Sequence, residues 1–361
     1  MRNPFNPTFG RIPKVYLSRK KIAGRLAEEL DDFDSQYLAT LVYGARGAGK
    51  TTLLSAVSRE LAGRKDWIVV DLPSAKWIVP KVAREVYEQS PTGLKVLLKI
   101  IAGVKTGLSG YRQPQQSSAD AATQMEAIAK LLKARKIKLL ITIDEVVPNP
   151  ELAEFTANYQ ILIRHGYHIG LLLAGLPANI TRLQNDRVLT FLFRSPRVEL
   201  TPLDPLMINE TYHRVFEKAG RTLTDEAATE MVRLVGGYAY AFQLVGSLIW
   251  ETGATAVTID TVNQVRRDFR ATLFSNAYLK IKQELSARDI EFLMALADQP
   301  AGPVKIATLI DALKWSKETV NVYRARLIDA QVIRPVRWGY VAFALPLFRD
   351  FLEESGHFAF Y

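Results

Sequence analysis

The residues best suited to chemistry lie together in the stretch Gly44–Thr52, which reads GARGAGKTT. It fits the pattern G-x-x-x-x-G-K-[ST], in which backbone N–H groups turn inward onto phosphate oxygens and glycine allows the angles this requires. We expect Lys50 to reach the β- and γ-phosphates and the Thr51 hydroxyl to bind Mg²⁺. The predicted nucleotide-binding residues are Gly44, Ala45, Arg46, Gly47, Ala48, Gly49, Lys50, Thr51 and Thr52.

A pair of carboxylates could complete this site. Asp144 and Glu145 follow the apolar run KIKLLITI. Asp144 could hold Mg²⁺ through its water shell, and Glu145 could polarise the attacking water as a general base. Alone, each motif has a simpler explanation, namely a glycine turn or a strand that ends in two solvated acids. Together they favour a nucleotide site, and since no N-K-x-D motif occurs we expect ATP rather than GTP.

A second set of polar side chains lies near the C-terminus. Lys317, Asn321 and Arg324 recur at i, i+4 and i+7 on the outer face of an expected helix, and Arg334 and Arg337 lie in the hairpin pattern VIRPVRWGYVAF. Three helical segments followed by such a hairpin are typical of a winged helix-turn-helix. Arginine can read guanine and asparagine adenine in a major groove, while wing arginines grip phosphates or a minor groove. Winged helices also dock proteins, and that alternative stays open.

Elements that could position the first site alternate along residues 38–175. Four near-continuously apolar runs are typical of parallel strands covered on both faces, and helical periods separate them. The expected strands are Leu38–Tyr43, Trp67–Leu72, Lys138–Asp144 and Gly170–Ala174. This is an α/β nucleotide-binding layout. The stretch 103–119, rich in Gly, Gln and Ser, predicts an exposed loop.

Helical patterns take over after Pro202, where we expect no strands before residue 286. Thr224 and Asp260 are expected N-caps in this region, and Ser286 opens a capping box. The expected helices are Pro205–Lys218, Thr224–Val235, Tyr238–Glu251 and Asp260–Leu285. The chain therefore divides into an α/β domain at 1–200, a helical domain at 201–285 and a winged helix at 286–361.

The composition excludes several classes of protein. The 361 residues include no cysteine and four histidines. Disulfides and cysteine-ligated zinc are therefore excluded, and His165 and His168 are too few ligands for a zinc site by themselves. A formal net charge of +10 favours polyanionic partners such as nucleic acid. No apolar run could span a membrane and no signal-peptide core is visible, so we expect a cytoplasmic protein without a membrane partner.

The two nucleotide motifs, GARGAGKT and LLITIDEV, resemble those of AAA+ ATPases, in the branch that holds origin-recognition-like initiators and the related STAND ATPases. The N-terminal NPFNPTFGRIPKVYLSRKKIAGRLAEEL and the later LLLAGLPANI and RSPRVELTPLD extend the resemblance over about residues 1–270. It implies an AAA+ core, an α-helical lid and a winged helix. It also implies an arginine finger just before the strand at Val198–Leu200, for which Arg194 and Arg197 are candidates, and self-association through the ATPase domain.

Two departures from that pattern bear on catalysis. Where the resembling ATPases carry a polar residue after the fourth strand, this chain has Ala174–Gly175–Leu176–Pro177, with Asn179 displaced beyond. The arginine expected near Tyr238–Tyr240 is absent. We therefore expect slow hydrolysis of ATP to ADP and phosphate, with the nucleotide acting more as a conformational latch than as fuel.

The function that the sequence favours is that of an ATPase whose nucleotide state controls double-stranded DNA binding by the winged helix, in an initiator or mobile-element role. The alternative is a STAND-like signalling switch, in which the winged helix docks on the ATPase core and the partner is a protein. Residues 91–119 carry no assigned role.

Overall fold

The structure is a computed structural model that describes residues 2–8, 13–15, 17, 19–101, 118–186 and 189–356. The chain forms two compact units. The α/β unit comprises Arg19–Tyr43 and Lys50–Glu199, and the helical unit comprises Met1–Ser18, Gly44–Gly49 and Leu200–Tyr361. The six residues Gly44–Gly49, called the glycine loop below, thus belong to the helical unit although the strand before them and the helix after them do not.

A five-stranded parallel sheet forms the centre of the α/β unit, with strand order β2-β3-β4-β1-β5. The strands are β1 (Ala39–Tyr43), β2 (Trp67–Leu72), β3 (Lys138–Ile143), β4 (Ile169–Gly175) and β5 (Arg197–Glu199). All four strands expected between residues 38 and 175 are confirmed to within one residue at each end. Every residue of β4 is buried, because parallel strands in such a layer are covered on both faces.

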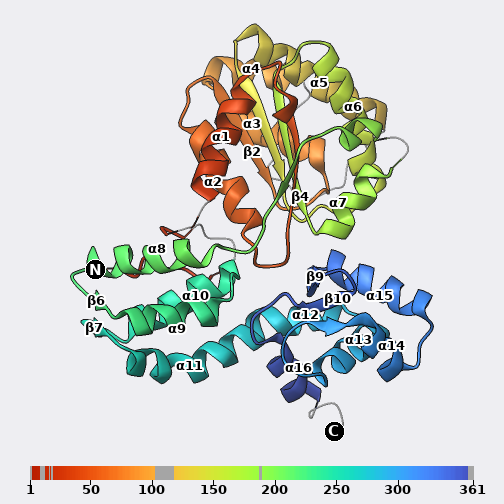
Figure 1. Cartoon of the computed structure of the whole chain (residues 1–361). Helices are drawn as coiled ribbons and strands as arrows, with labels where there is room; N and C mark the ends of the chain where they lie inside the picture. Colours follow the sequence, from red (N-terminus) through yellow and green to blue (C-terminus); the bar gives the residue numbers. More distant parts are fainter. Residues whose placement is uncertain are drawn as a thin grey trace, which may run out of the picture. The chain divides into compact units, whose positions relative to one another are not determined.

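Helices flank this sheet: in Figure 1 the strands lie between α1 and α2 on one side and α5 and α6 on the other. The helices are α1 (Arg19–Asp31), α2 (Lys50–Ala62), α3 (Ile78–Gln89), α4 (Thr92–Ile101), α5 (Ser118–Ala134), α6 (Pro150–Arg164) and α7 (Pro177–Gln184). Most of the loop expected at 103–119 lies outside the described residues, and its last two residues begin α5 instead. Leu94 and Leu98 of α4 are buried in the core of the unit, which gives part of 91–119 a packing role.

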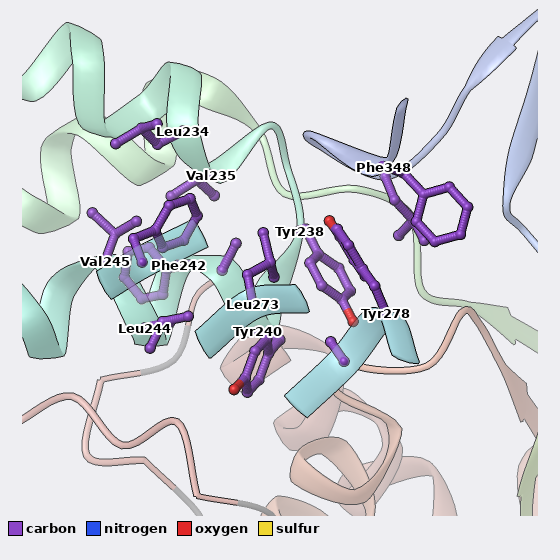
Figure 2. Close-up of a cluster of buried hydrophobic side chains, with 14 of the residues drawn as sticks. Leu234, Val235, Tyr238, Tyr240, Phe242, Leu244, Val245, Leu273, Tyr278 and Phe348 are labelled. Carbon is purple, nitrogen blue, oxygen red and sulfur yellow. The ribbon is translucent and has the colours of Figure 1, made fainter. Parts of the chain in front are cut away.

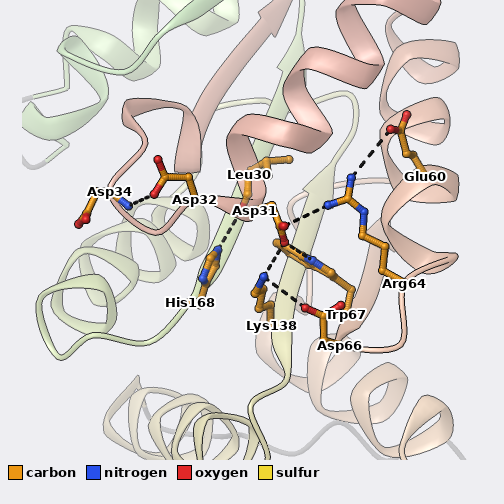
Figure 3. A network of polar contacts seen from close by, with 10 residues as sticks. All are labelled: Leu30, Asp31, Asp32, Asp34, Glu60, Arg64, Asp66, Trp67, Lys138 and His168. Carbon is orange, nitrogen blue, oxygen red and sulfur yellow. Dashed lines mark hydrogen bonds and ion pairs between the residues drawn. The ribbon is translucent and has the colours of Figure 1, made fainter.

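A polar network ties the amino ends of the strands to two helix ends (Figure 3). Asp31, the last residue of α1, accepts hydrogen bonds from Lys138 Nζ at 2.5 Å and Trp67 Nε1 at 3.0 Å, and pairs with Arg64 at 3.3 Å. The hydrogen bond from Lys138 lowers the pKa of the Asp31 carboxyl. His168, at the amino end of β4, lies with Nε2 2.8 Å from the Leu30 carbonyl. This network lies at the opposite edge of the sheet from the carboxyl end of β1, the point in the chain where the glycine loop begins.

The helical unit begins with a lid, residues 201–285, whose helices are α8 (Pro205–Glu217), α9 (Asp225–Val235), α10 (Ala239–Glu251), α11 (Ile259–Leu273) and α12 (Leu279–Glu284), with a π-helix at Phe274–Tyr278. Thr224 is confirmed as an N-cap. Asp260 as an N-cap is wrong: Thr258 takes that position, in a capping box with Thr261, so the Asp260 side chain lies inside the first turn.

The expectation of no strands in the lid is also wrong, because β6 (Thr222–Leu223) pairs in parallel with β7 (Ala256–Val257). Each strand has only two residues, too few for a periodic pattern to show in the sequence.

The C-terminal part is a winged helix. Its elements are α13 (Ala287–Ala297), β8 (Val304–Lys305), α14 (Ile306–Leu313), α15 (Lys317–Asp329), β9 (Ile333–Arg337), β10 (Tyr340–Phe343) and α16 (Phe348–Gly356). The capping box at Ser286 is confirmed. The hairpin expected from the sequence is β9–β10, and β8 adds a third antiparallel strand in the order β8-β10-β9.

Candidate nucleotide-binding loop and nucleic-acid interface

The glycine loop joins β1 to α2, which begins at Lys50. Gly47 and Gly49 have φ angles of 72° and 96°, in the left-handed region that favours glycine. Gly44 is confined by its neighbours, since an added Cβ would lie 3.0 Å from the Cβ of Leu200. A glycine loop whose N–H groups can turn inward, followed directly by a helix amino end, is the sequence arrangement typical of phosphate sites.

A hydroxyl and a carboxylate meet beside this loop. Thr51, in the first turn of α2, donates a hydrogen bond to Asp144 Oδ2 at 2.5 Å, although the two lie 93 residues apart. Among the described residues, no group of three or more His, Asp or Glu side chains could hold a metal. A cation here would therefore keep waters or phosphate oxygens as its other ligands. That coordination, with oxygen donors throughout, is the one Mg²⁺ prefers, so Thr51 and Asp144 fit this ion.

Glu145, the expected general base, is exposed and has a φ of 47°. A glutamate in this left-handed region is uncommon, and strained residues of this kind cluster at functional sites. Its N–H donates to Asp144 Oδ1 at 2.9 Å, and the N–H of Val146 donates to the Ala174 carbonyl at 2.8 Å. The N–H of Asp144 also donates to the Leu72 carbonyl at 2.9 Å, so bonds to β2 and β4 hold the backbone on either side of Glu145.

The structure explains why the end of β4 carries no polar side chain. Gly175, the last residue of β4, packs so closely on Val146 that an added Cβ would lie 2.8 Å from its Cγ2. Asn179 lies in the first turn of α7 and is half-buried. A polar residue at position 175 has no room, and Asn179 is the nearest amide along the chain.

The glycine loop makes close contacts with the lid. The Gly47 carbonyl accepts a hydrogen bond from the N–H of Tyr240 at 3.2 Å. An added Cβ at Gly47 would lie 2.7 Å from Cζ of Tyr238 and closer still to its hydroxyl. Tyr238 is the N-cap residue of α10, in the region where the sequence lacks the expected arginine. A buried aromatic ring thus takes the place beside the loop, and burial raises the pKa of Tyr238.

Arg46 provides a second contact between the loop and the end of the lid. Its guanidinium forms a two-pronged ion pair with Glu284, with Nε 3.1 Å from Oε2 and Nη2 near Oε1. Glu284 is the last residue of α12, two positions before the N-cap of the winged helix at Ser286. Bidentate pairs of this type fix the geometry of both partners.

Aromatic contacts continue from the lid into the winged helix, as Figure 2 shows for Tyr238, Tyr278 and Phe348. The rings of Tyr238 and Tyr278 stack with centroids 6.3 Å apart. Tyr278, which ends the π-helix, donates its hydroxyl to the Pro346 carbonyl and packs edge-on against Phe348 at 5.0 Å. π-helical turns often occur at functional sites. Gly47, Tyr238, Tyr278 and Phe348 thus form a continuous series of contacts.

Both candidate arginine fingers lie on the surface. Arg194 follows the 3₁₀-helix Thr190–Phe193, and Arg197 is the first residue of β5. Both side chains are exposed, and β5 is an edge strand of the sheet. This location is open to a second molecule, and the finger role of either residue stays a prediction.

Helix α15 presents part of the expected polar face. Lys317 and Asn321 are exposed, whereas Arg324 is half-buried, and its Nε is covered without a hydrogen-bond partner in the described part of the chain. Val322, which is 63% exposed, lies on the open face of the helix. The sequence pattern overlooked Val322 because an aliphatic residue is normally assigned to the core.

The wing carries the two expected arginines on its edge strand. Arg334 and Arg337 of β9 are exposed, and the Arg337 guanidinium lies 4.0 Å from the centroid of the Tyr340 ring. Trp338, in the turn that follows, is 98% exposed. The wing therefore presents both expected arginines, and in addition an indole, to solvent.

Sequence reasoning overlooked Asp71, at the carboxyl end of β2. Its carboxylate accepts hydrogen bonds from Ser58 Oγ and Thr142 Oγ1, both at 2.6 Å. Thr142 lies two residues before Asp144, so Asp71 belongs to the same edge of the sheet as the nucleotide motifs. The signal was an acid inside the apolar run WIVVDL.

The chain has the fold of AAA+ ATPases of the origin-recognition type: a parallel P-loop sheet, a helical lid and a winged helix. The Walker-type ATPase PABY2304 of Pyrococcus abyssi is 16% identical, with a TM-score of 0.65 over 94% of this chain and 96% of that chain. The Aeropyrum pernix ORC2 protein, solved as ADPNP–ADP complexes, is 13% identical, with a TM-score of 0.62 over 98% of both chains. The Aeropyrum pernix ORC1 protein, solved in complex with DNA, is 16% identical, with a TM-score of 0.51 over 98% of this chain and 96% of that chain.

Sequence comparisons add one match. A family model described as a domain of unknown function (DUF8462) matches residues 276–352, which cover the end of the lid and the winged helix. A search of curated protein sequences gave no significant match. Among the described residues, none of the helices combines the length and the apolar character needed to cross a membrane.

Proposed function

We propose that this chain is an ATP-binding AAA+ ATPase that couples its nucleotide state to the binding of double-stranded DNA through the winged helix. The observation that carries this proposal is that the glycine loop packs within the same unit as the winged helix. The loop contacts Tyr238 and Glu284 of the lid, and Tyr278 of the lid contacts the winged helix. A ligand bound to the loop would therefore alter the contacts of the loop with the lid, and the lid in turn contacts the winged helix that carries the proposed DNA-binding side chains.

In this proposal the nucleotide is held by the glycine loop and by the residues that follow it at the start of α2. The loop amides and the amino end of α2 bind phosphate oxygens, and Lys50 neutralises the terminal phosphates. Thr51 and Asp144 would hold Mg²⁺, which when bound offsets the charge of the phosphates. The left-handed backbone at Gly47 and Gly49, which glycine tolerates, supports this proposal.

Hydrolysis is proposed to be slow. Glu145 would accept a proton from water, and Arg194 or Arg197 of a second copy would supply positive charge. In the two regions where the resembling ATPases sense the γ-phosphate, this chain has the apolar end of β4 at Gly175 and the buried Tyr238. Two stabilising groups are thus missing from the chain's own site, which favours a latch with long-lived nucleotide states.

The DNA contacts are assigned to two elements of the winged helix. Lys317 and Asn321 on α15 face solvent and can enter a major groove, and Arg334 and Arg337 on β9 can bind phosphates. ATP can change DNA affinity only if it binds one conformation of the helical unit more tightly than another, and only by the size of that difference. Contacts of the loop with Tyr238 and Glu284 provide a source for such a difference.

The test is a gel-shift titration of duplex DNA with and without ATP–Mg²⁺, using the full chain and two lysine variants. Lys50→Ala should abolish ATP binding in calorimetry and remove the effect of ATP on duplex affinity. Lys65→Ala, at an exposed lysine just after α2, is the matched control and should behave as the unaltered chain. Unchanged ATP binding by Lys50→Ala would disprove the phosphate-site assignment.

A second candidate, a STAND-like switch with a protein partner, is favoured by the extent to which the winged helix is fastened to the lid. Arg270 of α11 pairs with Asp350 at 2.9 Å and with Glu354, both on α16. Together with the Tyr278 contacts, these ion pairs hold the winged helix against the lid, which favours a winged helix engaged with protein rather than with DNA. Tightly retained ADP in purified protein, with no duplex binding at low salt, would favour this second candidate over the first.

A further inference from the structure

Trp338 is the most exposed of the large hydrophobic side chains in the described part of the chain, at 98%. Val336, two residues earlier, is 40% exposed, and other exposed apolar side chains such as Leu206 lie elsewhere in the fold. Tryptophan combines a large apolar surface with a single N–H donor and usually lies against a partner surface. An indole that contacts so little of its own chain is therefore a candidate for contact with a ligand.

The hairpin presents Trp338 on a rigid support. Arg337 pairs with Tyr340, so Trp338 and Gly339 form the two-residue turn, and Gly339 has a φ of 76°. Strand β10 lies between β8 and β9, which fixes the hairpin on the sheet. The Arg337 guanidinium over the Tyr340 ring stiffens the base of the turn further. A rigid support lowers the entropy lost when the indole binds.

Charge identifies the kind of partner. The chain from residue 330 to residue 349 contains no Asp or Glu, while Arg334 and Arg337 flank the tip and are exposed. An apolar protein surface would leave both guanidinium groups without partners, whereas a duplex offers phosphates to them and base faces to the indole. The combination of two exposed arginines and one exposed aromatic ring is therefore complementary to DNA.

We propose that Trp338 is a base-contacting residue: the wing enters the minor groove of duplex DNA, and the indole wedges against a base step while Arg334 and Arg337 hold the flanking phosphates. This inference rests on the proposed DNA-binding function and specifies the chemistry of one contact within it. Apolar wedges of this type unstack a step and kink the duplex. Flexible pyrimidine–purine steps cost least to deform, so the wedge gives the wing a preference for them.

The experiment measures duplex affinity over a series of salt concentrations for the full chain and four variants. Trp338→Ala should weaken binding about 5- to 150-fold, as expected for loss of one aromatic–base contact, with the log–log salt slope unchanged. Trp338→Phe should retain most of the affinity. Arg337→Ala should instead lower the slope by about one, because a phosphate contact is lost. Leu206→Ala, at an exposed apolar residue of α8, is the control and should change nothing.

A second measurement detects the wedge itself. A duplex carrying 2-aminopurine at a pyrimidine–purine step should gain fluorescence when the full chain binds, and the gain should be absent with Trp338→Ala at saturating protein. Absence of duplex binding by the unaltered chain at low salt would overturn the proposed function. Binding that Trp338→Ala leaves unchanged would overturn only the wedge. Loss of self-association in Trp338→Ala, with DNA affinity intact, would also overturn it and assign the indole to a second copy of the chain.

Discussion

Replacing Gly47 by alanine should damage nucleotide binding through its contact with Tyr238. Two costs can be separated. The backbone at Gly47, with φ of 72°, costs a residue with a Cβ about 1–2 kcal/mol. The new Cβ would also lie 2.7 Å from Cζ of Tyr238, whereas carbon atoms normally approach to about 3.5–4.0 Å. Overpacking of a buried site adds about 1–3 kcal/mol.

The total, about 2–5 kcal/mol, opposes the loop conformation seen here. If ATP requires that conformation, affinity should fall by about 30-fold or more, since about 1.4 kcal/mol corresponds to a factor of ten. Tyr238 cannot move aside easily, because it is buried and stacked on Tyr278. Adding Tyr238→Ala to Gly47→Ala removes the overlap and should recover about 1–3 kcal/mol of the loss, leaving the backbone cost.

Calorimetric titration with ATP–Mg²⁺ and thermal unfolding of both single variants and the double variant form a double-mutant cycle. Gly220→Ala is the matched control, because Gly220 has a φ of 71° and no atom within 4 Å of an added Cβ. Gly220→Ala therefore measures the free-energy cost of a Cβ on a left-handed backbone alone, without a steric overlap. If Gly47→Ala destabilises no more than Gly220→Ala and binds ATP normally, or if Tyr238→Ala fails to restore binding, the argued contact between loop and lid does not act on the nucleotide.

Two further predictions follow from the polar contacts. Burial lowers the pKa of His168, with a further lowering by Lys138 opposed by Asp31 and the Leu30 carbonyl. The unfolded chain therefore takes up the proton first, so stability should be full above about pH 6.5 and fall as the pH decreases below it. His168→Gln, which keeps an N–H donor for Leu30, should flatten this dependence of the melting temperature between about pH 7 and 5. Glu284→Gln should weaken the ion pair with Arg46. ATP affinity should stay within about threefold, whereas the effect of ATP on duplex affinity should become smaller. If ATP still changes duplex affinity as much as in the unaltered chain, this ion pair has no role in coupling.

Much of the fold could be predicted because it depends on local patterns. The strands of the sheet are continuous apolar runs, and the N-cap Thr224 and the capping box at Ser286 are signals within one helical turn. The errors occurred where the local signal was weak or ambiguous. Thr258 and Asp260 are both acceptable N-cap residues two positions apart, and the reciprocal bonds of the capping box between Thr258 and Thr261 accompany the earlier start.

In the candidate site, too, some features follow from local sequence and others only from tertiary packing. The sequence alone determined that this chain has a glycine loop of the phosphate-binding pattern, a carboxylate-ended strand and a basic hairpin, because each consists of neighbouring residues whose types restrict the backbone or carry the charge. Tertiary structure alone decided which distant groups they meet: Arg46 pairs with Glu284 across 238 positions and Thr51 with Asp144 across 93. Such partners depend on how helices and strands pack, which no local periodicity encodes. The exposure of Trp338 belongs to this second kind, since the pairing of Arg337 with Tyr340 decides that Trp338 lies in the turn and not in a strand.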